Sequence, residues 1–331
     1  MYSSGKTVTR LRSRMSGLSS DIGWLLGSYR SYFSKARGAR ILLYHGLCKG
    51  DPLRYNTLFV NHKTFESQLR LYKEYFNLVS LDDLYAQRFS DDRFNICLSF
   101  DDGFSNNYRY VLPLLEQYQV PAVFFITAIR NEGYDVLWND ALSIAYKNGP
   151  EKIGFDDELF VKGRDSRYKS AQSGKKLAEV IRGYGFEKKA AMLKLLNQFL
   201  ARADKDYWMQ MTTEEIKLLS SSRWATIGSH GYYHNDLAVI AGDALKEELV
   251  RSKQFLENVT GKEIKALAFP YGSYSDTVIN EATAAGYTQL LTTAYQLPED
   301  AANPLLKERL TINPFISNIN QLHATISGNY K

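Results

Sequence analysis

Two aspartates stand side by side directly after an apolar run. Asp101 and Asp102 follow residues 94–100 and are themselves followed by Gly103. Adjacent carboxylates raise each other's pKa unless a cation lies close to them. A metal ion is the commonest cation that could take this position, so the pair predicts a metal-dependent site at the end of a buried strand.

Three of the five histidines also stand at the ends of apolar segments. His45 ends the segment that begins at Arg40, and His230 and His234 follow residues 225–229 with the spacing His-x-x-x-His. One carboxylate and two imidazoles suit a divalent transition metal with positions left for water and substrate. Because parallel strands end at one edge of a sheet, we expect these groups to converge there.

The segments that carry these residues alternate between strand and helix patterns. Repeated strand–helix units imply right-handed parallel crossovers, and about seven such units favour closure into a barrel over an open sheet. In either case ligands bind at the carboxyl ends of the strands. Apolar runs predict strands at 40–46, 78–81, 94–100, 122–128, 225–229, 266–269, 289–293 and 309–312. Apolar periodicity predicts helices at 64–76, 107–118, 243–259 and 276–285.

Two segments interrupt this alternation. Residues from about 131 to 212 are far more than one crossover needs, and their polar, helix-prone composition predicts a helical insertion over one face of the barrel. Residues 1–38 are basic and include Trp24, which predicts either peripheral contact with an anionic membrane surface or a helix packed on the barrel exterior. We therefore expect an N-terminal segment, 1–38, and one domain, 39–331, that carries the insertion.

Composition narrows the class of protein. The chain has 331 residues, 44% apolar and 23% charged, which is typical of soluble globular proteins, and its net charge is only +5. There is no pattern for nucleic-acid binding, no signal-peptide cleavage pattern and no apolar stretch of the roughly 18 residues that a membrane span needs. Cys48 and Cys97 form no CxxC pair, so we expect reduced, buried thiols. This favours a cytoplasmic setting, either free or at the inner membrane face.

Three short motifs resemble those of the polysaccharide deacetylases, the NodB-homology or carbohydrate esterase family 4 group. The family motif [TS]-F-D-D-G matches S-F-D-D-G at 99–103, H-[ST]-x-x-H matches H-G-Y-Y-H at 230–234, and R-x-P-[YF]-G matches A-F-P-Y-G at 268–272 except at its arginine. Order and spacing agree from about residue 40 to residue 312. The resemblance implies an α/β fold, a distorted (β/α)7-type barrel, and hydrolysis of the N-acetyl group of an amino sugar.

The resemblance also implies a role for each motif residue. Asp102, His230 and His234 become ligands of a divalent metal, zinc in the first place, with cobalt, nickel, manganese or iron as alternatives. Asp101 becomes the general base that accepts a proton from the attacking water. The backbone N–H of Tyr271 would bind the oxyanion, and Pro270 and Tyr271 would contact the substrate.

The chain departs from the family pattern within and after these motifs. Gly231 replaces a hydroxyl residue, Asn235 replaces the usual proline, and Ala268 replaces the arginine that orients the base. The late Leu-x-His that supplies a general acid is absent from 290–294.

Other residues are candidates for the missing roles. We expect Arg309 to orient the base, against a plain salt-bridging arginine, and His45 to be the acid or a substrate contact, against a structural His-Gly turn. His323 is the only later histidine and a second candidate for the acid. Trp138 could stack on a sugar ring, with Asp140 near the site, or it could anchor the insertion.

Several functions remain open on the sequence alone. An O-acetyl carbohydrate esterase would share the water attack and the oxyanion site, and a sugar-binding pseudoenzyme would retain the fold without the reaction. The expected partner is an N-acetylated glycan or a lipid- or nucleotide-linked sugar, and nucleic acid is not expected.

Overall fold

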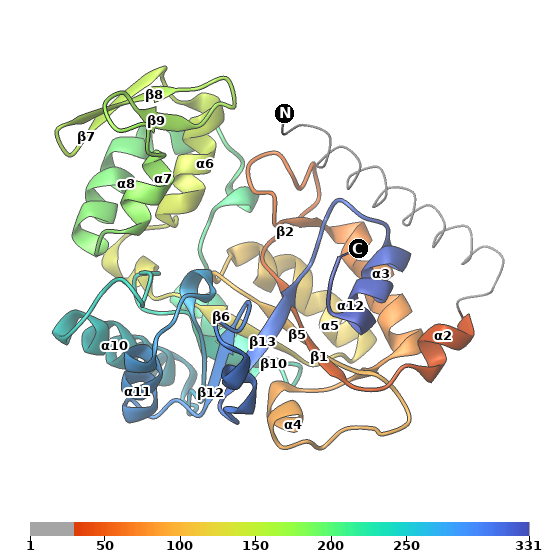
Figure 1. Cartoon of the computed structure of the whole chain (residues 1–331). Helices are drawn as coiled ribbons and strands as arrows, with labels where there is room; N and C mark the ends of the chain where they lie inside the picture. The colour runs from red at the N-terminus through yellow and green to blue at the C-terminus, as the bar shows by residue number, and fades with distance from the viewer. Residues whose placement is uncertain (1–29, 331) are drawn as a thin grey trace.

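The computed structural model describes residues 30–330, and its centre is a closed ring of parallel strands (Figure 1). The ring consists of β1 (Ala39–Tyr44), β5 (Asn95–Phe100), β6 (Ala122–Ile126), β10 (Ala225–Ser229), β11 (Ala266–Ala268), β12 (Gln289–Thr292) and β13 (Leu306–Thr311). β1 pairs with β13 on one side and with β5 on the other, so the order β1-β13-β12-β11-β10-β6-β5 closes on itself. This ring confirms the predicted α/β fold with a seven-stranded parallel barrel.

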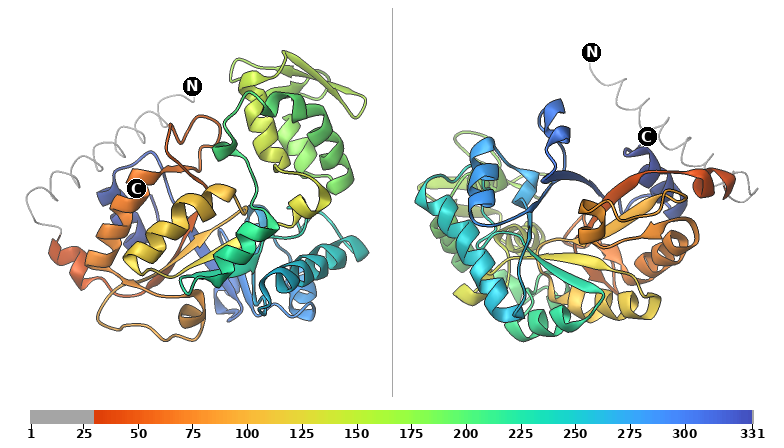
Figure 2. Two further views of the ribbon diagram at one scale, coloured as in Figure 1. Left: turned by 180° about the vertical axis from the view of Figure 1, so that it is seen from behind. Right: turned by 90° about the horizontal axis from the view of Figure 1, so that it is seen from below.

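Helices cover the outside of the ring (Figure 2). Their apolar residues recur every three or four positions, as Phe65, Leu69 and Tyr72 do in α3, and these side chains are buried against the strands. The helices of the barrel are α3 (His62–Tyr75), α4 (Leu81–Tyr85), α5 (Leu112–Tyr118), α9 (Thr213–Ser221), α10 (Asp243–Thr260), α11 (Asp276–Ala284) and α12 (Asn318–Ser327). Residues 107–111, at the start of the helix predicted over 107–118, form a π-helical turn.

The strand predicted at 78–81 is shorter than expected. β4 (Asn77–Leu78) pairs only with the first residues of β5 and takes no place in the closed ring. Ser80 accepts a hydrogen bond from the backbone N–H of Asp83 and caps α4. The helix therefore begins where the apolar pattern alone suggested that the strand continues.

Strand alternation determines which side chains enter the barrel. Cys97, Val123 and Phe125 form an inner apolar cluster, whereas the alternate residues of the same strands pack outward against the helices. By the same period of two, Ser99 and Asp101 continue the inward-facing row of Cys97. A buried carboxylate therefore lies directly above the apolar interior.

The insertion stands to one side of the barrel and has an apolar core of its own (Figures 1 and 2). It contains α6 (Trp138–Asn148), α7 (Leu177–Arg182) and α8 (Phe186–Leu200), as its composition predicted. It also contains an antiparallel sheet of β7 (Lys152–Phe155), β8 (Glu158–Lys162) and β9 (Tyr168–Ser170), which the sequence analysis did not predict. Each of these short strands buries only one apolar side chain and so carries little hydrophobic signal: Ile153, Phe160 and Tyr168.

The described part of the N-terminal segment packs on the barrel exterior. Phe33 of α2 (Arg30–Lys35) is fully buried, with its ring centroid 5.4 Å from that of Tyr75 and 4.8 Å from that of His323. The expected membrane contact around Trp24 lies outside the described residues. Within residues 30–330, no helix has the length and apolar character needed to span a bilayer. Cys48 and Cys97 are buried free thiols, as expected.

Candidate active site

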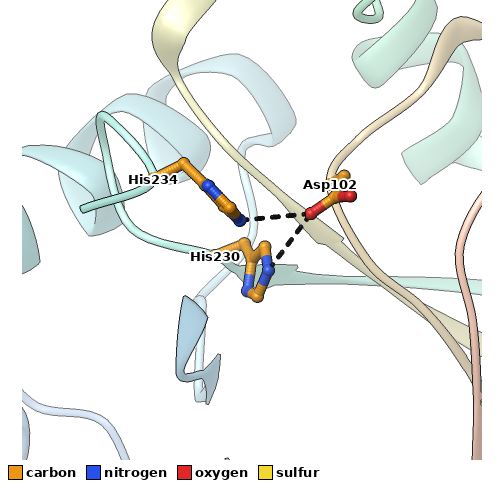
Figure 3. Close-up of side chains that lie close together, drawn as sticks. All are labelled: Asp102, His230 and His234. Atoms are coloured by element: carbon orange, nitrogen blue, oxygen red, sulfur yellow. Dashed lines mark ion pairs between the residues drawn. The ribbon is translucent and has the colours of Figure 1, made fainter. Parts of the chain in front are cut away.

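Three buried ligand side chains converge at the carboxyl ends of β5 and β10 (Figure 3). One oxygen of Asp102 lies 3.4 Å from Nε2 of His230 and 3.3 Å from Nε2 of His234. Ligands placed about 2.0–2.2 Å from a tetrahedral metal ion lie about 3.3–3.6 Å from each other. The separations and the donor types therefore fit a divalent metal ion held by one carboxylate and two imidazoles.

The outer ring nitrogens of both histidines have partners that orient the rings. Nδ1 of His230 donates to the carbonyl oxygen of Ala268 at 2.8 Å, and Nδ1 of His234 lies 3.1 Å from the hydroxyl oxygen of Tyr271. These contacts leave both Nε2 atoms directed at Asp102, as metal-binding histidines require. Burial lowers the pKa of His234, whereas the charges of Asp101 and Asp102 outweigh burial and raise the pKa of His230. A metal ion would compete with that proton.

The departures at Gly231 and Asn235 have a common cause on α10. Glu248 of this helix is buried, and its Oε1 accepts hydrogen bonds from the backbone N–H groups of Tyr233 and Asn235 at 2.9 and 3.3 Å. Gly231 has φ +75°, and a Cβ there would lie 2.8 Å from the same oxygen. Asn235 donates to the other Glu248 oxygen at 2.9 Å and accepts from Nζ of Lys189 on α8 at 2.8 Å. The loop between the histidines is thus held by a polar network that needs these two residues.

Three non-glycine residues of the site have left-handed backbone conformations. Asp102, His234 and Tyr271 have φ values of +74°, +57° and +62°. Such conformations cost roughly 1–3 kcal/mol each and persist where the surrounding structure enforces them. At Asp102 the reversal of the chain after β5 lets both neighbouring carboxylates face the same site.

Asp101 forms a bidentate ion pair with Arg309 of β13. The two guanidinium nitrogens lie 2.6 and 2.8 Å from the two carboxylate oxygens, and both residues are buried. Burial alone would raise the pKa of Asp101, but the charges of Arg309 and His230 outweigh it and lower that pKa. The structure thus places the Arg309 guanidinium against both oxygens of the Asp101 carboxylate. Asp101 is ionised at neutral pH and separate from the three metal-ligand candidates.

A cavity of about 670 Å³ opens over this group. Its floor includes Asp101, the three ligand candidates, His45 and Tyr271. His45 is half-buried, its Nδ1 is buried without a hydrogen-bond partner among residues 30–330, and burial lowers its pKa. His45 thus lies at the rim of the barrel, because it directly follows the end of β1.

Asp140, which we expected near the site but without a chemical role, also lines the cavity. Its side chain is buried; Oδ1 accepts a hydrogen bond from Nδ2 of Asn56 at 3.1 Å, and Oδ2 has no partner among residues 30–330. Burial and the charge of Asp102 raise its pKa well above the usual range of a carboxyl group. No motif surrounds this residue, and only the fold of the insertion brings it to the cavity.

Three other predicted residues do not line the cavity. Trp138 is buried in the core of the insertion, where its Nε1 donates to the Tyr271 hydroxyl at 3.1 Å, so it has the anchoring position and not that of a sugar-stacking surface. Pro270 is buried and does not line the cavity, although its neighbours Phe269, Tyr271 and Gly272 do. His323 stacks on Tyr32 with ring centroids 5.2 Å apart, which removes it as a candidate acid.

The chain is similar to proteins of one known family. The family model described as polysaccharide deacetylase matches residues 90–154 and 192–290. The chain belongs to the polysaccharide deacetylase family, carbohydrate esterase family 4. No curated protein matches the chain in sequence.

Solved structures show the same fold at low sequence identity. The deacetylase PplD of Streptococcus pyogenes, in complex with acetate, is 18% identical, with a TM-score of 0.58 over 88% of this chain and 99% of its own. IcaB from Ammonifex degensii is 16% identical, with a TM-score of 0.54 over 88% and 98%. A de-N-acetylase from Aggregatibacter actinomycetemcomitans is 17% identical, with a TM-score of 0.52 over 84% and 96%.

Replacing Arg309 by methionine leaves the buried Asp101 carboxylate without its partner. We expect Arg309→Met to lower the free energy of unfolding by about 3–5 kcal/mol, the usual cost of removing one member of a buried ion pair. Adding Asp101→Asn removes the uncompensated charge and should recover part of this loss. Denaturant unfolding followed by circular dichroism, with chelator present so that metal binding does not contribute, measures both effects.

The matched control is Arg223→Met, because Arg223 is exposed and forms no ion pair among residues 30–330. It should change the unfolding free energy by less than about 0.5 kcal/mol. Equal losses in the two arginine variants would contradict the importance of the buried pair.

Proposed function

We propose that the protein is a metal-dependent deacetylase that hydrolyses the N-acetyl group of an amino sugar in a glycan or glycan precursor. One observation carries this proposal. A buried Asp102-His230-His234 group and a separate ionised carboxylate, Asp101, face the same cavity. This arrangement supplies a metal site together with a base that does not itself need to bind the metal.

The reaction divides among the residues as follows. A bound divalent ion, zinc in the first place, would polarise the acetyl carbonyl and lower the pKa of water to roughly 7. Asp101, oriented by Arg309, accepts a proton from water as its oxygen attacks the acetyl carbon. The backbone N–H of Tyr271 donates to the oxyanion that forms on the former carbonyl oxygen. The C–N bond then breaks, and acetate and a free sugar amine are released.

The leaving nitrogen needs a proton, and two groups of the cavity could deliver it. His45 has a buried Nδ1 without a partner among residues 30–330, and Asp140 has a buried Oδ2 in the same condition. Burial and the charge of Asp102 raise the pKa of Asp140 and so favour its protonated, donating form, whereas burial lowers the pKa of His45 and favours its neutral imidazole. His45 is our proposed acid or substrate contact, and Asp140 is the alternative donor that the structure adds.

An O-acetyl esterase is the second candidate, and the missing late histidine favours it. An alkoxide leaves more readily than an amide nitrogen, so ester hydrolysis depends less on a general acid. A pseudoenzyme that binds sugars without hydrolysis is the third, and the complete ligand set with its base argues against it.

Substitutions of the two neighbouring aspartates should distinguish the loss of metal binding from the loss of proton transfer. We expect Asp102→Asn to lose both the metal and the activity, because it removes a ligand. Asp101→Asn should keep about one metal ion per chain and lose roughly 10²–10⁴ in kcat, the usual contribution of a general base. Metal analysis of the purified protein, before and after chelation, and acetate release from N-acetylated oligosaccharides measure the two effects.

Chelation should abolish acetate release from the wild type, and added zinc should restore it. Wild-type protein that binds no stoichiometric metal and loses nothing on chelation would overturn the enzyme proposal. Equal metal loss in both variants would show that Asp101 is a ligand and not a free base.

The identity of the proton donor can be tested with amide and ester substrates. We expect His45→Gln to reduce N-deacetylation about 10²–10⁴-fold while aryl-acetate cleavage partly survives, because only the amide needs a strong donor. Asp140→Asn should show the same split if Asp140 is the donor. The variant whose amide rate equals that of the wild type excludes its residue from proton donation.

The pH dependence should report the Asp101–Arg309 pair. Arg309→Lys keeps the positive charge but loses the bidentate fork, so the pKa of Asp101 rises. The base then becomes protonated at a higher pH than in the wild type, and the acid limb of the kcat/KM profile should move to higher pH. An unchanged acid limb would show that it reports another group.

A further inference from the structure

The outer wall of the cavity differs from its floor because it is lined by cations. Arg54, Lys147 and Arg167 line the cavity that contains the ligand group, and all three are exposed. They come from three segments: the loop between β2 (Leu47–Cys48) and β3 (Val60–Asn61), helix α6, and the turn before β9. The wall is therefore assembled only when the loop and the insertion come together (Figure 1).

Two of these cations flank one aromatic ring. The guanidinium carbon of Arg54 lies 5.4 Å from the ring centroid of Tyr55, and Nζ of Lys147 lies 5.5 Å from the same centroid. The ring attracts each cation weakly, but two like charges around one ring repel each other. An anion between them would remove this repulsion.

The structure supplies no such anion from the chain itself. Among residues 30–330, the side chains of Arg54, Lys147 and Arg167 form no ion pair and no hydrogen bond. Asp165 is the carboxylate of this outer wall, and it pairs with Lys169 at 3.6 Å and accepts from the backbone N–H of Arg167 at 3.3 Å. Arg54 and Lys147 thus face the cavity without a fixed counter-charge, and the nearby Asp165 is shared between Arg167 and Lys169.

We propose that this wall binds a phosphate or diphosphate through which the acetylated sugar is attached to its carrier. The inference rests on the proposed function, because that function places the N-acetyl group at the floor. A cavity of about 670 Å³ has room for more than one sugar ring, so the group attached to the sugar reaches the wall. A phosphate offers several charged oxygens to an arginine fork and a lysine together, whereas a single carboxylate suits one arginine.

The test compares KM values of the wild type and of a variant that lacks two wall charges, for substrates with different carriers. The variant Arg54→Gln/Lys147→Gln keeps the side-chain stems and removes two charges. Its substrates are a nucleoside diphosphate N-acetylhexosamine, a short-chain polyprenyl diphosphate N-acetylhexosamine and a neutral N-acetylhexosamine oligomer. We expect KM for a diphosphate substrate to rise at least tenfold, as for a lost charge-assisted contact, and KM for the neutral oligomer to change less than twofold. The carrier that the wild type turns over tells the nucleotide source from the lipid source.

The matched control is Lys152→Gln/Arg164→Gln. Both residues are exposed, do not line the cavity and form no ion pair among residues 30–330. This variant has the same net charge as the test variant and should leave every KM within twofold of the wild type. Equal effects of the two variants would show a general charge effect and overturn the proposal.

A binding measurement keeps this proposal separate from the deacetylase proposal. Calorimetric titration of the metal-loaded protein with a sugar-free nucleoside diphosphate should show binding that the test variant weakens at least tenfold and the control does not. Acetate release with no dependence on the wall charges would overturn the phosphate site and leave the deacetylase standing. Binding of the nucleoside diphosphate without acetate release from any substrate would overturn the deacetylase proposal and leave the phosphate site standing. An N-acetylated oligomer that carries uronic acids is the fourth substrate; charge dependence for this oligomer and for no diphosphate substrate would assign the wall to carboxylates and overturn the phosphate proposal.

Discussion

The site depends on the burial of two neighbouring carboxylates that need different partners. β5 delivers both, and each carries a negative charge out of contact with bulk water. Arg309 of β13 compensates the charge of Asp101. His230 and His234 lie against Asp102, and they or an ion that they bind would compensate its charge. Because each carboxylate has its own compensation, one can hold a metal while the other stays free to accept a proton.

The insertion supports the metal-ligand loop as well as the cavity wall. All three of its helices send side chains to this region: Trp138 of α6 contacts Tyr271, Lys189 of α8 contacts Asn235, and Arg182 of α7 pairs with Asp236 at 2.7 Å. The Arg182 guanidinium also lies 4.6 Å from the Tyr271 ring centroid. Since Tyr271 contacts His234 in turn, the position of that histidine is coupled to the packing of the insertion.

The sequence predicts most of the barrel and of the ligand group because both leave local signals. Fully buried parallel strands read as continuous apolar runs, and Asp101, Asp102, His230 and His234 stand in short motifs at strand ends. Arg309 could be proposed because a known role was vacant and a strand-end arginine was available. Trp138 was ambiguous, since the same indole can line a cavity or fill a core, and its surroundings decide between them.

Other features could not be predicted, because their meaning arises only from tertiary contacts. Glu248 and Lys189 stand on amphipathic helices, where a charged residue is ordinarily exposed, yet both are buried around Asn235. Asp140 was expected near the site, but its buried Oδ2 without a partner among residues 30–330 arises only from the fold of the insertion against the barrel. The strands β7–β9 bury too few apolar side chains to show a period of two.

One departure from the family motifs is offset by another element of the barrel. A guanidinium reaches Asp101 from β13, whereas β11 offers only Ala268. The carbonyl of Ala268 meanwhile orients His230, a contact that needs the backbone of this position and not its side chain. The barrel thus fixes the positions of charge, while the sequence element that supplies each charge can change.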